Sequence, residues 1–243
     1  MPHVPLFSSP EFSGKSARGK YGDAIEELDH NVGRLLDALK QQGIAEKTLV
    51  VYSSDNGPWD KGADGGTAYP FRGYKFSNWE GGMRVPAIFW WPGTIPANQV
   101  RDEPAIVLDL YRTIARLTGG GVPTDRVIDG EDIWPLVMGE PGAKHGPIYY
   151  DLGAIREGNW KLREGALYNL ANDPHEDNNL AVANPAIVDD LRGKLQAFQN
   201  DVKQNSRPLG GAGSEAQPSG CTNPAAPNYD INAKVDDGSC GVL

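Results

Sequence analysis

The most constraining feature of the sequence is a helical repeat that leads, after a short turn, into an apolar strand. Apolar side chains recur three and four residues apart between residues 15 and 42, which is the spacing of one face of an α-helix. Gly43 follows as the expected C-terminal cap. Residues 48–54 are then apolar without alternation, which is typical of a strand buried on both faces, as in a parallel sheet. Helix, turn and buried strand form half of a βαβ unit, so we predict an α/β fold.

The rest of the chain predicts further elements around a long loop. Residues 55–84 are rich in glycine and lack periodicity, and a connection of this length is usually functional. We expect a mixed or parallel sheet flanked by helices, followed by a small antiparallel sheet with a C-terminal helix. The expected elements are a strand over 85–91, a helix over 107–117, short strands over 148–150, 160–163 and 166–168, and a helix over 187–202.

These patterns divide the chain into four regions. We assign residues 1–125 to the α/β portion, 126–204 to the small-sheet subdomain, 205–220 to a flexible linker and 221–240 to a tail module. The tail is too short to hold its own core. It contains the two cysteines of the chain, Cys221 and Cys240, and we predict a disulfide between them. A disulfide indicates an oxidising compartment.

Composition excludes several classes of partner. A net charge of −9 repels phosphate backbones and anionic lipid, so we expect no nucleic acid partner. No stretch approaches the roughly 18–20 apolar residues that a membrane span requires. The N-terminal segment also lacks the basic and apolar regions of a signal peptide. That lack conflicts with a disulfide, which is a feature of exported proteins.

A candidate metal site follows the first predicted strand directly. Asp55 and Asn56 lie at its C-terminal end, the edge where ligands bind in open α/β sheets. A carboxylate beside an amide oxygen suits a hard divalent cation, which prefers oxygen donors. The alternative, which the motif alone favours, is that Asp-Asn-Gly-Pro only makes a turn.

Two cationic candidates accompany this pair. Lys75 is flanked by aromatic residues in the glycine-rich loop and can present a point charge to an anion. The alternative for Lys75 is a solvated surface lysine. His3 lies between two prolines near the N-terminus, where a frayed end is the alternative. The remaining histidines, His30, His145 and His175, show no ligand spacing, and no Gly-x-Ser-x-Gly, Walker-type or Cys-x-x-Cys motif occurs.

Taken together and in order, several segments resemble the formylglycine-dependent, arylsulfatase-like sulfatases of the alkaline phosphatase superfamily. The matching segments are PHVPLF at 2–7, GKYGDAIEELDHNVGRLLDAL at 19–39, TLVVYSSDNGP at 48–58, RGYKFSNWEGGMRVPAIFWWPG at 72–93 and DGEDIWPLVMGE at 129–140, followed by WKLR and ALYNLANDPHEDNNLA. The match extends over residues 1 to about 203. The resemblance implies an alkaline-phosphatase-like sheet and sulfuric ester hydrolysis, expected on a sulfated glycan or small molecule.

The resemblance also implies roles for the candidate residues. Asp55 and Asn56 match half of the family's calcium site. Lys75 matches the lysine that binds the sulfate group, and His3 matches the histidine that touches the sulfate or its leaving oxygen. A centre that gathers negative charge at sulfur needs a cation, a lysine and donors arranged around it.

The chain departs from the family at the nucleophile. The family's formylglycine is made from the Cys or Ser of a C/S-x-P-S/A-R motif, which is absent here, as is the early aspartate pair of the metal site. We therefore expect a fragment: the C-terminal half of a secreted or periplasmic sulfatase, inactive alone, whose signal peptide would belong to the missing half. Its expected partners are that missing half or a second copy through the exposed sheet.

Alternative readings remain for the tail and for the whole chain. The tail resembles a small Cys-bounded repeat of secreted marine bacterial proteins. Four tail residues could hold calcium or be solvated turn residues: Asp230, Asn232, Asp236 and Asp237. The chain as a whole could instead be a non-catalytic extracellular binding module, or belong to a phosphodiesterase or phosphonate hydrolase of the same superfamily.

Overall fold

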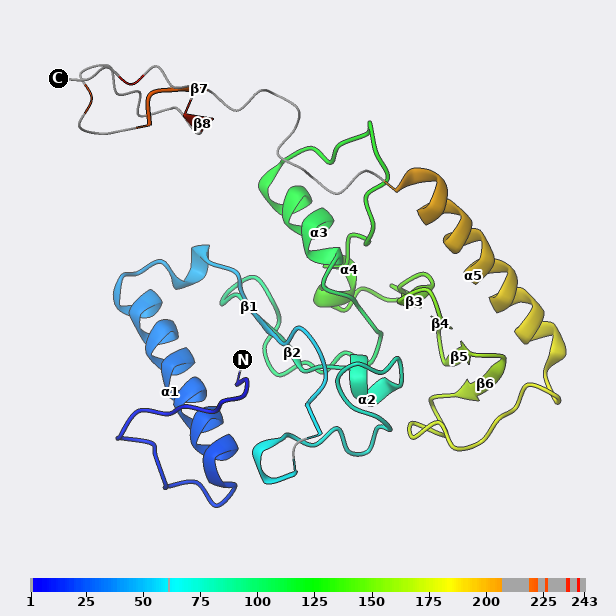
Figure 1. Cartoon of the computed structure of the whole chain (residues 1–243), viewed down its shortest axis with the longest axis horizontal. Coiled ribbons are helices and arrows are strands. Elements are labelled where there is room, and N and C mark those ends of the chain that lie inside the picture. Colours follow the sequence, from blue (N-terminus) through cyan, green and yellow to red (C-terminus); the bar gives the residue numbers. More distant parts are fainter. Residues whose placement is uncertain are drawn as a thin grey trace. The chain divides into compact units, whose positions relative to one another are not determined.

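The computed structural model describes residues 2–60 and 62–206, together with 219–222, 226, 235–236 and 240. The chain divides into two compact units, residues 1–200 and 201–243. Its elements in chain order are α1 (Gly19–Gln41), η1 (Ala45–Lys47), β1 (Val50–Ser53), η2 (Gly62–Asp64), α2 (Glu80–Met83), β2 (Ala87–Trp90), α3 (Asp109–Thr118), α4 (Trp134–Met138), β3 (Ile148–Tyr150), β4 (Ala154–Glu157), β5 (Trp160–Arg163), β6 (Ala166–Asn169), α5 (Pro185–Asn205), β7 (Ser219–Gly220) and β8 (Val235–Asp236) (Figure 1).

The first sheet differs in detail from the expectation. In the described part of the chain it has two strands, β1 and β2, which pair antiparallel with Val51 opposite Phe89. Neither strand is buried on both faces: β1 is half-buried along its length, and Ile88 of β2 is 58% exposed. The continuous apolar runs therefore correctly predicted strands. The expected burial between parallel neighbours is absent in the described part of the chain, where one surface of these strands stays uncovered.

The predicted small antiparallel sheet is present and has four strands in the order β3-β4-β5-β6. Its core joins Ile155, Leu162 and Leu167 of the sheet to Val188 and Leu191 of α5. Figure 1 shows α5 running alongside these strands. Strand β4 was missed, because its buried residues include a charged side chain, Arg156, and do not alternate.

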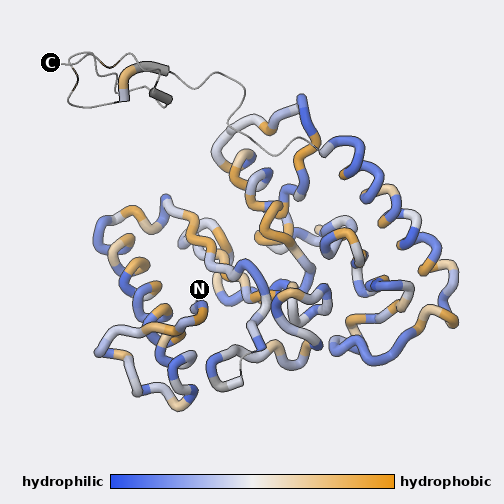
Figure 2. Tube along the Cα trace, viewed as in Figure 1, coloured by the Kyte–Doolittle hydropathy of each residue, from blue (hydrophilic) through white to orange (hydrophobic). Residues whose placement is uncertain are grey.

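The helices follow their predicted periodicity. Figure 2 shows hydrophobic residues recurring between hydrophilic ones along α1 and α3. The helix predicted over 15–42 forms α1, and that predicted over 107–117 forms α3, which ends at a left-handed Gly119. No helix among the described residues has the length and apolar character needed to cross a membrane.

The tail falls largely outside the described residues. A disulfide joins Cys221 to Cys240, as the cysteine count predicts. Residues 207–218 of the expected linker lie outside the described part, as do Asp230, Asn232 and Asp237 of the tentative calcium set.

A buried ion network ties the long loop to the small sheet. The Nζ atom of Lys161, on β5, lies 2.9 Å from Oε1 of Glu80 and 2.9 Å from Oε1 of Glu176. All three side chains are at most 1% exposed. Glu176 Oε2 accepts the backbone N–H of Glu80 at 2.7 Å, and Arg156 Nη1 lies 3.3 Å from Glu80 Oε2. The Glu176 Oε1 contact is an ion pair without hydrogen-bond alignment.

Aromatic rings pack around this network. Lys161 Nζ lies 4.3 Å from the ring centroid of Tyr150. Burial, and then the Glu80 carboxylate, raises the pKa of Tyr150 above its usual value. The guanidinium groups of Arg72 and Arg163 each lie 4.0 Å from the Trp79 ring. Charges and rings together fix both ends of the segment from Arg72 to Glu80.

Removing the central cation of this network tests its contribution. We expect Lys161→Met to lower the free energy of unfolding by about 3–5 kcal/mol, because two buried carboxylates lose their shared partner. Urea unfolding followed by far-UV circular dichroism measures the change.

The matched control is Arg192→Met on α5. It breaks a surface ion pair with Asp189, in which the Arg192 side chain is 61% exposed. We expect this control to change stability by less than about 1 kcal/mol. Equal effects of the two substitutions would contradict a structural role for the buried network.

Candidate functional site

Glycines allow the long loop to close on itself. The amide of Gly57 donates to the carbonyl of Gly82 at 2.9 Å, and that of Gly81 donates to the carbonyl of Arg72 at 2.7 Å. A Cβ on Gly57 would lie 2.0 Å from the Gly81 oxygen, and one on Gly82 would lie 2.2 Å from the Ser77 oxygen. No larger residue fits at these positions, so glycine here is a packing requirement.

The closed loop brings two predicted site residues together at Trp59. The amide of Lys75 donates to the carbonyl of Pro58 at 2.8 Å. Lys75 Nζ lies 5.9 Å from the Trp59 ring centroid and 5.3 Å from that of Phe76. The ring of His3 lies 5.7 Å from the Trp59 ring. His3 and Lys75, far apart in sequence, therefore both lie beside one indole ring.

The N-terminal segment that carries His3 is held against α1. Its backbone amides at Gly14, Lys15 and Ser16 donate to the carboxylate of Asp23 at 2.8–3.1 Å. These hydrogen bonds, of which the one from Ser16 has the largest effect, lower the pKa of Asp23. The Ser9 amide also donates to Glu27 Oε2 at 2.8 Å. These bonds fix residues 9–16, whereas the His3 side chain itself is exposed.

Asp55 and Asn56 directly precede the Gly57-Pro58 pair that anchors Lys75. Ser54 Oγ donates to the Asn56 carbonyl at 3.0 Å and approaches Asp55 Oδ1 at 3.5 Å. The Asp55 side chain is exposed at the end of β1. Its oxygens fit a hard cation in kind. Among the described residues, however, no group of three or more His, Cys, Asp or Glu side chains is arranged to hold a metal.

His145, assigned no role from the sequence, is a buried structural group. Its Nε2 lies 3.1 Å from Asp109 Oδ1, and both side chains are at most 2% exposed. Burial alone would lower its pKa, but the Asp109 carboxylate and the Gly146 carbonyl raise the pKa of His145 to about 9. The pair ties α3 to the segment before β3.

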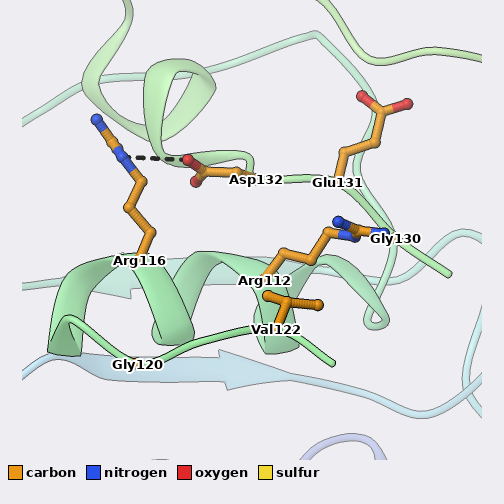
Figure 3. Close-up of a pocket in the computed structure, with 7 residues that line it drawn as sticks. All are labelled: Arg112, Arg116, Gly120, Val122, Gly130, Glu131 and Asp132. Atoms are coloured by element: carbon orange, nitrogen blue, oxygen red, sulfur yellow. Dashed lines mark ion pairs between the residues drawn. The ribbon is translucent and has the colours of Figure 1, made fainter. Parts of the chain in front are cut away.

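A separate pocket of about 570 Å³ lies beside α3 (Figure 3). It is lined by Arg112, Arg116 and the segment 130–132. Arg116 Nε pairs with Asp132 at 3.2 Å, and Arg112 Nη2 donates to the Ile128 carbonyl at 2.7 Å. None of the predicted site residues lines this pocket, and each of its arginines makes a contact with a protein group, although Arg112 Nε is buried without a hydrogen-bond partner. The Trp59 cluster therefore remains the better candidate.

Sequence reasoning missed the residues that assemble the site. Trp59 and Phe76 were visible only as aromatics near a lysine, and their contacts span segments that no local pattern relates. Glu80 and Lys161 were given no role from the sequence. An ionic residue on a short strand beside bulky apolar ones, as in Trp160–Arg163, is the signal that was available.

Comparisons with known proteins agree on one family. The sequence model of the sulfatase family matches residues 1–120. Steryl-sulfatase of Homo sapiens is 45% identical over 144 residues, which is 57% of this chain and 25% of that protein. N-acetylgalactosamine-6-sulfatase of Canis lupus familiaris is 44% identical over 153 residues, covering 62% of this chain and 29% of that protein.

Solved structures show the same likeness. PsFucS1 sulfatase from Pseudoalteromonas sp. superposes with a TM-score of 0.78 at 28% identity, covering 85% of this chain and 48% of that chain. Ps i-CgsB in complex with k-i-k-neocarrahexaose gives a TM-score of 0.72 at 32% identity, covering 84% and 49%. These likenesses confirm the predicted α/β class. The chain spans about a quarter of the length of the curated relatives and about half of the solved structures.

The geometry around Asp55 predicts weak calcium binding by the 243-residue chain. Asp55 and Asn56 supply two donor side chains, whereas Ca²⁺ takes roughly six to eight oxygen ligands. We expect a calorimetric titration with Ca²⁺ to give a dissociation constant no tighter than about 1 mM.

The matched control is Asp60→Ala, which removes an exposed carboxylate of the same segment. Micromolar affinity that is lost in Asp55→Ala and kept in Asp60→Ala would show that the site is complete within the chain.

Proposed function

We propose that this chain, which belongs to the sulfatase family, forms the sulfate-binding part of a sulfuric ester hydrolase. The observation that carries the proposal is that His3 and Lys75 both lie beside the Trp59 ring. These residues come from separate segments of the sequence, and each matches a sulfate-contacting residue of the sulfatase family. The family match and the shared fold support this assignment.

The chemistry of the cluster suits a sulfate ester. The Lys75 ammonium, half-buried beside the Trp59 ring, offers a point charge that attracts the sulfate oxygens more strongly than a solvated lysine would. His3 provides a ring nitrogen that could donate a hydrogen bond to the leaving oxygen. Asp55 and Asn56 would contribute two oxygen ligands to a Ca²⁺ ion, which would supply further positive charge at the sulfate group.

Hydrolysis needs a nucleophile that the 243 residues do not supply. The family's C/S-x-P-S/A-R motif does not occur in this sequence. Positioning and charge cannot replace a covalent nucleophile such as formylglycine. We therefore assign binding to this chain, and turnover to an assembly with residues outside it, which would also complete the metal site. The half-covered strands β1 and β2 offer the surface for that association.

A sulfated glycan in an extracellular or periplasmic setting is the substrate class we propose. A related solved structure, 32% identical to this chain, is a complex with k-i-k-neocarrahexaose. The Cys221–Cys240 disulfide supports an oxidising compartment. A sulfated steroid is the competing class, because steryl-sulfatase is among the relatives.

Binding of inorganic sulfate by the isolated chain tests the proposal. We expect NMR titration to show saturable binding that Lys75→Met weakens at least tenfold, since a charge-assisted contact is lost. Lys20→Met, which removes an exposed lysine of α1, is the matched control and should bind as the parent does.

Activity provides the second arm of this test. We expect the pure chain to release no sulfate from an aryl sulfate above background. Turnover by the pure chain that Lys75→Met abolishes would contradict the assignment of binding alone to this chain. Sulfate binding that is indifferent to Lys75→Met would contradict the site itself.

A further inference from the structure

Phe76 is presented to solvent on a fixed turn beside Lys75. Its side chain is 85% exposed, and its backbone adopts φ +72°, which is unusual for a bulky residue. The turn is fixed on both sides: the Lys75 amide donates to the Pro58 carbonyl, and Ser77 donates to the Tyr74 carbonyl through its amide at 3.1 Å and its hydroxyl at 2.7 Å. The ring is thus held outward by a rigid backbone, without the burial that normally stabilises an aromatic residue.

The rings of Phe76 and Trp59 form a right-angled corner around the ammonium group. Their centroids are 6.3 Å apart and their planes meet at 89°. Lys75 Nζ lies 5.3 Å from the Phe76 ring and 5.9 Å from the Trp59 ring. Such an edge-to-face pair leaves most of the Phe76 ring uncovered, as its exposure of 85% shows. The corner therefore combines an aromatic face with a positive charge a few ångströms away.

This combination matches a ring that carries a sulfate group. An aromatic face packs against the C–H face of a pyranose, and the hydroxyl edge of the sugar stays in water. A sulfate on that pyranose would extend toward Lys75, whose charge it complements. The residues on either side of Phe76 in the chain, Lys75 and Ser77, are polar, whereas a steroid would require a continuous apolar wall.

We propose that Phe76 is the specificity residue of this site: it stacks on the pyranose that bears the sulfate ester while Lys75 binds the ester group. The proposal rests on the proposed sulfate-binding function and adds to it the recognition of the sugar. It divides the binding between two neighbouring residues, one selecting the ring and one selecting the charge. Each contribution can therefore be removed separately.

Titrations of the 243-residue chain with three ligands separate these contributions. The ligands are inorganic sulfate, N-acetylgalactosamine 6-sulfate and k-i-k-neocarrahexaose, followed by NMR. We expect at least one sulfated sugar to bind more tightly than inorganic sulfate, and Phe76→Ala to weaken that sugar at least tenfold. The same substitution should leave the affinity for inorganic sulfate within twofold. Phe76→Tyr, which keeps the ring, should restore sugar binding.

The matched control is Tyr69→Ala, which removes an aromatic side chain that is 86% exposed in the same long loop. It should leave all three affinities unchanged. Phe76→Ala should also keep the unfolding transition of the parent, since an exposed ring contributes little packing.

Several outcomes would overturn the assignment of Phe76. They are sugars that bind no better than inorganic sulfate, equal sugar affinity in Phe76→Ala and the parent, and an equal loss in Tyr69→Ala. Tighter binding of estrone sulfate than of either sugar would overturn the choice of a pyranose. Failure of the proposed function is distinguishable, because it appears as sulfate binding that Lys75→Met does not change.

Discussion

The buried contact between Lys161, Glu80 and Glu176 is the constraint on which the rest of the site depends. Ions removed from water are tolerated only when their partners are fixed in place. Lys161 belongs to the small sheet, Glu80 closes the long loop, and Glu176 lies beyond β6. The network therefore requires three segments, separated by as many as 96 residues, to meet at one point. It holds the C-terminal end of the loop that presents Lys75.

The N-terminal end of that loop is determined by glycine packing. The Gly57–Gly82 hydrogen bond brings the segment after β1 against α2 and leaves Trp59 facing Lys75. His3 lies beside the same indole, and the chain that follows it is tethered to α1 through Asp23. Trp59 thus collects side chains from parts of the chain that share no secondary structure. The candidate site is a loop site positioned by rigid surroundings, which is a common arrangement for binding sites.

Features determined by local pattern were predictable from the sequence. The helical repeat identified α1, the apolar run identified β1, and the position of Asp55 at its end follows from both. The pairing direction of β1 and β2 was not predictable. A parallel sheet was inferred from the expected burial of both strand faces, but that burial depends on which other segments cover the strand. The inward orientation of Lys161 was missed for a related reason: a lysine reads as exposed unless its carboxylate partners are known, and these lie in distant segments. The contact of His3 with Trp59 is likewise tertiary; local sequence made His3 and Lys75 candidates, and only the family resemblance implied a shared role for them.

The central claim is that the long loop and the small sheet form one cooperative structure. Native-state hydrogen exchange tests it through the amides of Lys75 and Gly81 in the loop and of Leu162 in β5. If the buried network joins the two parts, the three amides should exchange through openings that agree within about 1 kcal/mol. Loop amides that exchange almost without protection, while Leu162 stays protected, would contradict the account and leave Lys75 on an independently moving loop.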